Sequence, residues 1–143
     1  LAPQLTLTHG KKLGKLIKAS GASPIVWLHW SRRESPASSF ERIDATLRKL
    51  ADTLSCPLLP CGQAWRTLEA EDAGINPYSS DDSHPSPEGT YLNAAVIYTL
   101  VTGLSAENVP SGIPAEVSPA DARVIQDVAM ETIREFDYEA EAP

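Results

Sequence analysis

Apolar residues recur every three or four positions in several segments of the chain, and this spacing predicts helices. The first covers residues 5–19, where leucines and an isoleucine alternate with lysines and Gly21 is placed to cap the end. A second begins at Ser38, which has the spacing of a capping box with Glu41, and continues to Leu54. Further helices are expected over residues 62–71, over residues 88–102 before Gly103, and from Ser118, as N-cap, to about Arg134.

Two short stretches are continuously apolar instead of periodic, and they predict β-strands buried on both faces. They are residues 24–30, rich in β-branched and aromatic side chains, and residues 57–60. The helix between them makes a β-α-β unit, so the two strands are expected to be parallel neighbours. Helices alternating with buried strands indicate an α/β domain. Because such sheets usually have about five strands, we expect an upstream segment or a second chain to complete this one.

Composition and charge restrict the partners of the chain without choosing an activity. Its 143 residues are 42% hydrophobic and 22% charged, which fits one domain over residues 1–134 and an acidic, disordered tail over 135–143. A net charge of −7 predicts no binding to nucleic acid or to an anionic membrane. The three histidines show no metal-ligand spacing, and we expect no metal and no other cofactor. Nothing in the composition indicates a cellular compartment.

The most specific chemistry lies in residues 81–92, which read Asp-Asp-Ser-His-Pro-Ser-Pro-Glu-Gly-Thr-Tyr-Leu. An Asp three residues before a His can fold back to one ring nitrogen, fix the tautomer, and leave the other nitrogen to act as a general base. Pro85 and Pro87 restrict this loop and aim the imidazole. Two carboxylates, Asp81 and Asp82, compete to be the partner of His84.

The pattern Asp-x-x-His-Pro-Ser-x-x-Gly-Thr-Tyr-Leu closely resembles the last sequence block of SGNH/GDSL hydrolases, a family of serine esterases. The stretch Leu-Pro-Cys-Gly-Gln-Ala-Trp at residues 59–65 also resembles bacterial members of that family. The resemblance covers residues 10–103 and implies the C-terminal portion of a three-layer α/β/α flavodoxin-like SGNH hydrolase fold. It further implies that His84 is the general base and that Asp81, in preference to Asp82, orients it.

The same resemblance implies hydrolysis of acyl or acetyl esters of small molecules or carbohydrates, but the nucleophile is absent. The chain has neither the opening Gly-Asp-Ser block of the family nor its Gly-x-Asn-Asp block. Ser23 precedes a strand, and Ser31 has no glycine nearby to form an oxyanion hole. We therefore expect the serine to come from an N-terminal segment or a second chain, and this chain alone to be inactive.

The alternative function is a non-catalytic interaction or scaffold module derived from the same fold, and a truncated fragment without a role of its own is a third interpretation.

Trp30 and Trp65 fall near strand ends, on the side where α/β sheets bind ligands, and are candidate substrate-binding residues or else core residues. Arg32 and Arg33, at the same edge, are solvated loop residues or hold an anionic group. His29 is expected to be a buried structural histidine of the first strand.

Overall fold

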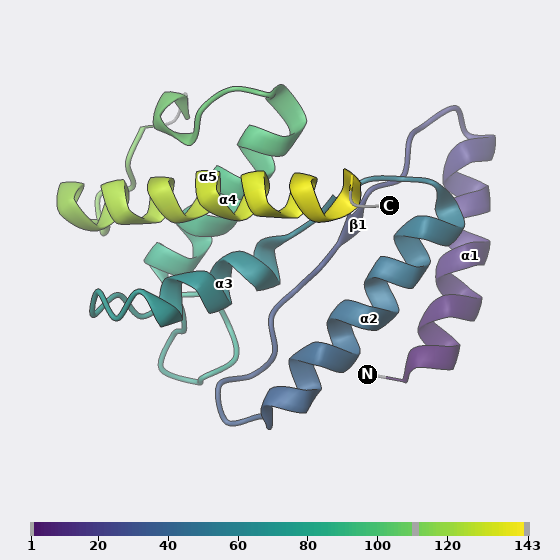
Figure 1. Cartoon of the computed structure of the whole chain (residues 1–143), viewed down its shortest axis with the longest axis horizontal. Coiled ribbons are helices and arrows are strands. Elements are labelled where there is room, and N and C mark those ends of the chain that lie inside the picture. The colour runs from purple at the N-terminus through teal and green to yellow at the C-terminus, as the bar shows by residue number, and fades with distance from the viewer. Residues whose placement is uncertain (1, 110–111, 142–143) are drawn as a thin grey trace.

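The computed structural model describes residues 2–109 and 112–141 of the chain, and side chains as far as residue 136. In chain order the described elements are α1 (Pro3–Ala19), β1 (Val26–Trp27), α2 (Ala37–Leu54), β2 (Leu58–Leu59), α3 (Cys61–Ala70), α4 (Pro87–Thr102), η1 (Ala106–Asn108) and α5 (Pro119–Glu141). The helices fall into two groups that β1 and β2 connect, α1 with α2 on one side and α3, α4 and α5 on the other (Figure 1). None of the described helices is long and apolar enough to cross a membrane.

The sheet is much smaller than the sequence predicts. β1 and β2 pair in parallel, with Val26 opposite Leu58, so the predicted β-α-β pairing is confirmed. The described residues contain no third strand, and the helices pack mostly on one another. The expected three-layer α/β/α flavodoxin-like fold is therefore wrong, and the described chain is mostly helical. Pro57 precedes β2 on the side that faces β1 and carries no N–H group to extend the ladder there, which is one reason the strands are so short.

One face and one edge of β1 are open, although its apolar sequence predicts burial on both faces. Val26 and Leu28 are buried beneath α2 and donate their backbone N–H groups toward β2. The alternate residues Ile25 and Trp27 are 46% and 47% exposed. The backbone groups of Trp27 point away from β2, because hydrogen-bonding direction alternates along a strand. No strand among the described residues pairs with that edge.

α1 and α2 make the smaller of two cores through glycine-mediated contact. A Cβ atom at Gly10 would lie 2.6 Å from the Leu50 side chain, and one at Gly14 would overlap Leu54. The missing side chains allow the two helices to approach closely. The opposite face of α1 leaves three leucines largely exposed: Leu5, Leu13 and Leu16.

α3, α4 and α5 enclose the larger core, and Trp65 is the largest side chain fully buried in it. The Trp65 indole N–H donates to Asn93 Oδ1 at 2.9 Å, so the polar atom of this ring is satisfied inside the core. A Cβ at Gly89 would overlap the Pro77 carbonyl oxygen, so only glycine lets α4 begin this close to the preceding loop. This core supports the loop that contains His84.

The helix ends confirm some local predictions and correct others. Ser118 Oγ accepts from the Asp121 N–H at 3.1 Å, and Gly103 ends α4 at a φ of 70°, both as predicted. The capping box at Ser38 is wrong: Pro36 is the N-cap of α2, which makes no side-chain cap hydrogen bond, and Ser38 lies inside the first turn. α5 is helical as far as Glu141, so the described part of the predicted tail is helix, and residues 142–143 lie outside the described residues.

Candidate active site

The loop between α3 and α4 folds back on itself through its own backbone contacts. The Ser79 N–H donates to the His84 carbonyl oxygen at 2.8 Å, and Tyr78 and Pro85 form an antiparallel bridge. Asp82 adopts a left-handed φ of 53°, which an aspartate tolerates better than most residues and which reverses the chain at the tip. The loop is consequently closed at its base and presents residues 80–84 at its tip.

Asp81 and His84 form a closely held pair at that tip. His84 Nδ1 lies 2.5 Å from Asp81 Oδ2. The other carboxylate oxygen, Oδ1, accepts from the backbone N–H groups of Ser83 at 3.0 Å and His84 at 2.9 Å, and from the Ser79 hydroxyl at 2.8 Å. Because an ionised carboxylate can only accept, Nδ1 carries a proton, and in the neutral ring Nε2 is the free base. This tautomer is the one that a general base requires.

Hydrogen bonding keeps the Asp81 carboxylate ionised. The pKa of Asp81 lies far below its ordinary value, and the largest cause is the hydrogen bond from the His84 ring. Smaller contributions come, in decreasing order, from the His84 backbone N–H, the Ser79 hydroxyl and the Ser83 backbone N–H. Each of these donors stabilises the charged form more than the protonated form. Asp81 therefore stays negative well below the ordinary pKa of an aspartate, and its charge can stabilise an imidazolium.

The pair is open to the outside. The His84 side chain is 79% exposed and that of Asp81 is 50% exposed. Within the described residues, Asp81 is the only hydrogen-bond partner of the His84 ring. A nucleophile could reach Nε2 without displacing any part of the chain.

Asp82 has a different partner. Its carboxylate lies 3.1 Å from Arg33 Nε, and its carbonyl oxygen accepts from the Arg33 N–H at 3.0 Å. Arg33 also donates to Asn76 Oδ1 and stacks over the Tyr78 ring, 4.7 Å from its centroid. Asp82 therefore ties the His84 loop to the loop after β1, and the charge of Arg33 is already paired with a carboxylate.

Aromatic rings hold the His84 loop from beneath. The Trp30 indole N–H donates to the Ser83 carbonyl oxygen at 2.9 Å, and the Trp30 ring stacks on Trp65 with centroids 3.9 Å apart. Tyr78 meets Trp65 edge-on at 4.7 Å and donates its hydroxyl to the Ser31 carbonyl oxygen at 2.9 Å. Burial, with the nearby Glu69 charge, raises the pKa of Tyr78 to about 12, so this hydroxyl keeps its proton.

Of the two tryptophans predicted near substrate, Trp30 is half-buried at the surface and Trp65 is buried beneath it.

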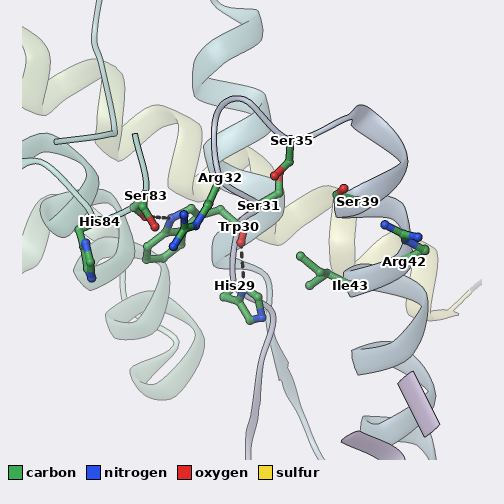
Figure 2. Close-up of a pocket in the computed structure, with 10 residues that line it drawn as sticks. All are labelled: His29, Trp30, Ser31, Arg32, Ser35, Ser39, Arg42, Ile43, Ser83 and His84. Atoms are coloured by element: carbon green, nitrogen blue, oxygen red, sulfur yellow. Dashed lines mark hydrogen bonds between the residues drawn. The ribbon is translucent and has the colours of Figure 1, made fainter. Parts of the chain in front are cut away.

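A groove of about 530 Å³ begins at His84 and continues to α2. Figure 2 shows His84 and Ser83 at one end, Ser39 and Arg42 at the other, and the loop after β1 between them. Its lining residues are His29, Trp30, Ser31, Arg32, Ser35, Ser39, Arg42, Ile43, Ser83 and His84. Within the described part of the chain, no three histidine, cysteine or acidic side chains converge as a metal site would require.

Several groove residues were missed by the sequence analysis. His29 is exposed, contrary to the expected burial, and its Nδ1 lies 2.8 Å from the Trp30 carbonyl oxygen, to which it donates. His29 is exposed because side chains alternate along an extended chain, which places it on the same uncovered face as Ile25 and Trp27. Ser39 and Arg42 lie three residues apart on α2, a spacing that could have grouped them on one side of that helix but carries no chemical motif, and Ser35 lies in the loop just before α2.

Comparison of the chain with protein-family models, with curated proteins and with solved structures found no match. The resemblance of residues 81–92 to one sequence block therefore has no support from overall similarity. The geometry of Asp81, His84 and the groove carries the functional proposal.

Replacing Ser79 with alanine is expected to raise the pKa of Asp81, because the carboxylate loses one donor to Oδ1. The titration of the Asp81 side-chain carboxyl carbon can be followed by NMR in the unaltered protein and in the Ser79→Ala variant. Since the folded pKa lies below the unfolded value of about 3.9, Asp81 stabilises the fold above that pH, and this contribution is lost as pH falls through the folded pKa. The Ser80→Ala variant is the control, and equal midpoints in S79A and S80A would contradict the prediction.

Proposed function

We propose that this chain supplies a general base, His84, and its orienting carboxylate, Asp81, to a serine outside the chain, in a hydrolase that acts on acyl or acetyl esters. The observation that carries the proposal is the 2.5 Å contact between His84 Nδ1 and Asp81 Oδ2, on a ring that is 79% exposed. A histidine held in this tautomer with Nε2 free is what activation of a serine hydroxyl requires.

The proposed reaction has two stages. Nε2 of His84 takes the proton of the serine hydroxyl as its oxygen attacks the ester carbonyl carbon, and Asp81 stabilises the imidazolium that forms. The proton then passes to the departing alcohol as the carbon–oxygen bond breaks, which leaves an acyl-serine. In the second stage His84 takes a proton from water as the water oxygen attacks the acyl-serine carbonyl carbon. The bond from that carbon to the serine oxygen then breaks, and His84 returns the proton to the serine oxygen, so that the carboxylic acid, the free serine and the neutral histidine result. The strongly lowered pKa of Asp81 suits this role, because Asp81 stays ionised throughout.

The exposure of the site supports a nucleophile from a second polypeptide. No serine among the described residues hydrogen-bonds the His84 ring. Next to the site, the half-exposed Trp27 ring meets Trp30 edge-on, with centroids 6.4 Å apart, and Ile25 is also exposed. A partner covering this apolar surface would exclude water from the site while it delivered its serine.

The test is to isolate the chain, with any polypeptide associated with it, from the cells that produce it, and to treat the preparation with a fluorophosphonate probe. Denaturing mass spectrometry is expected to show the probe on a serine of an associated polypeptide and none on the 15.4 kDa chain. The same preparation carrying His84→Gln should label at least about a hundredfold more slowly, since general base catalysis contributes about that much or more. Label on a serine of this chain, or no label at all, would overturn the proposal.

The exposed leucines of α1 favour a second candidate, an interaction module without chemistry. Leu5, Leu13 and Leu16 are 60%, 59% and 68% exposed. A helix face with three exposed leucines is an apolar surface of the kind that binds another protein. On this alternative an associated polypeptide is present, stays unlabelled, and remains bound when His84 is replaced. The labelling experiment therefore separates the two candidates.

A further inference from the structure

The charged side chains that line the groove beside His84 are arginines, although the chain is acidic and the Asp81 carboxylate lies behind the His84 ring. Its lining includes two arginines, Arg32 and Arg42, and no aspartate or glutamate, in a chain whose net charge is −7. Such a concentration of one sign of charge in a cleft favours ligands of the opposite sign.

The two arginines differ from their neighbours in having no carboxylate partner. Arg33 lies 3.1 Å from Asp82 and Arg48 lies 2.9 Å from Asp44. The guanidinium groups of Arg32 and Arg42 make no hydrogen bond or ion pair with any described residue. They are available to an incoming ligand without first breaking an interaction.

Hydroxyl groups line the groove between the two arginines. Ser31, Ser35 and Ser39 all contribute to the lining, and none of their hydroxyls has a hydrogen-bond partner among the described residues. Figure 2 shows Arg32 between the His84 end and the α2 end, where Ser39 and Arg42 lie. A volume of about 530 Å³ is within the range of small-molecule sites.

We propose that the groove binds an ester that carries a carboxylate, such as an acylated acidic sugar. The inference rests on the proposed function for the position of the ester, which lies at His84. The carboxylate lies toward Arg42 at the α2 end, and Arg32 adds positive charge along the path. Guanidinium groups suit this role because their paired donors match the two oxygens of a carboxylate. Free serine hydroxyls accept and donate hydrogen bonds to the remaining polar groups of the ligand.

The binding test uses the chain itself and glucuronate, a carboxylate-bearing sugar, with neutral methyl glucoside as the ligand control. An NMR titration is expected to shift the amide signals of Arg32, Ser39 and Arg42 with glucuronate and not with the glucoside. The variants Arg32→Gln and Arg42→Gln should each weaken glucuronate binding about tenfold, the effect of losing one charge-assisted pair. Arg123→Gln, on the exposed side of α5, is the matched control and should bind as the unaltered chain does. No shift at the groove, or an equal loss in Arg123→Gln, would overturn the inference.

A second measurement separates this inference from the proposed function. In the preparation that reacts with the fluorophosphonate, Arg42→Gln is expected to raise KM for a carboxylate-bearing ester about tenfold and to change KM for p-nitrophenyl acetate, which has no carboxylate, by a smaller factor. Arg123→Gln, outside the groove, is expected to leave the hydrolysis of both esters unchanged. Equal loss on both esters would overturn the inference and leave the hydrolase proposal intact. Glucuronate binding by a chain with which no labelled serine is associated would uphold the anion groove and reject the hydrolase.

Discussion

Asp81→Asn is expected to lower the rate of ester hydrolysis by the assembled enzyme by about 10⁴-fold, because it reverses the tautomer of His84. Three donors converge on Asp81 Oδ1, namely the N–H groups of Ser83 and His84 and the hydroxyl of Ser79. The amide oxygen of an asparagine must take that position, which places its NH₂ group where Oδ2 now faces His84 Nδ1. Nδ1 then has to accept a hydrogen bond, so the ring proton moves to Nε2 and the base is lost.

The matched control is Asp82→Asn. Asp82 faces Arg33, and the side chains of Asp82 and Arg33 are 45% and 42% exposed, respectively. An exposed ion pair of this kind contributes about 0–1 kcal/mol to the free energy of unfolding. We expect less than tenfold loss of rate in this variant. Turnover of p-nitrophenyl acetate by each assembled variant measures both effects, and ¹⁵N NMR of the histidine ring reports the tautomer in the isolated chain. A larger rate loss in Asp82→Asn, or an unchanged His84 tautomer in Asp81→Asn, would contradict the assignment.

Trp65→Ala is expected to lower the free energy of unfolding by about 3–5 kcal/mol, the usual cost of removing a buried tryptophan. The ring is fully buried, stacks on Trp30 and meets Tyr78 edge-on. Its removal also leaves Asn93 Oδ1 without its donor inside the core. Trp30 would lose its support, so the Ser83 carbonyl and the His84 loop would become more mobile.

Urea unfolding of the isolated chain measures this loss, with Trp27→Ala as the control. Trp27 is 47% exposed, so its replacement should cost about 1 kcal/mol or less. Equal destabilisation by the two replacements would show that the stacked tryptophans do not anchor the larger core.

The features that the sequence predicted well are those decided within a few residues. Ser118 caps α5, and Gly103 ends α4 in the left-handed conformation, because each depends only on its own turn. The parallel pairing of β1 with β2 also followed from the pattern, since the helix between them leaves little choice of direction. The capping box at Ser38 failed because Pro36, two residues earlier, already starts the helix.

Predictions that required knowledge of what covers an element were wrong. Residues 24–30 are apolar enough for a strand buried on both faces, yet Ile25, Trp27 and His29 are exposed. Hydrophobicity indicates that a residue favours burial, but whether another element reaches it depends on the packing of the whole chain. The three-layer fold was wrong for the same reason, because the described helices cover one another instead of two faces of a sheet.

The sequence by itself determined the central pair of the candidate site. A spacing of three residues in a proline-braced loop brings the Asp81 carboxylate to His84 Nδ1, and short loop geometry is enough to do so. Only the tertiary structure decided the rest: that Asp82 turns to Arg33, that Trp30 holds the Ser83 carbonyl, and that Arg42 on α2 shares a groove with His84. These contacts join segments far apart in the chain, 53 positions for Trp30 and Ser83. Their formation depends on how many side chains pack at once, which no local pattern of residues specifies.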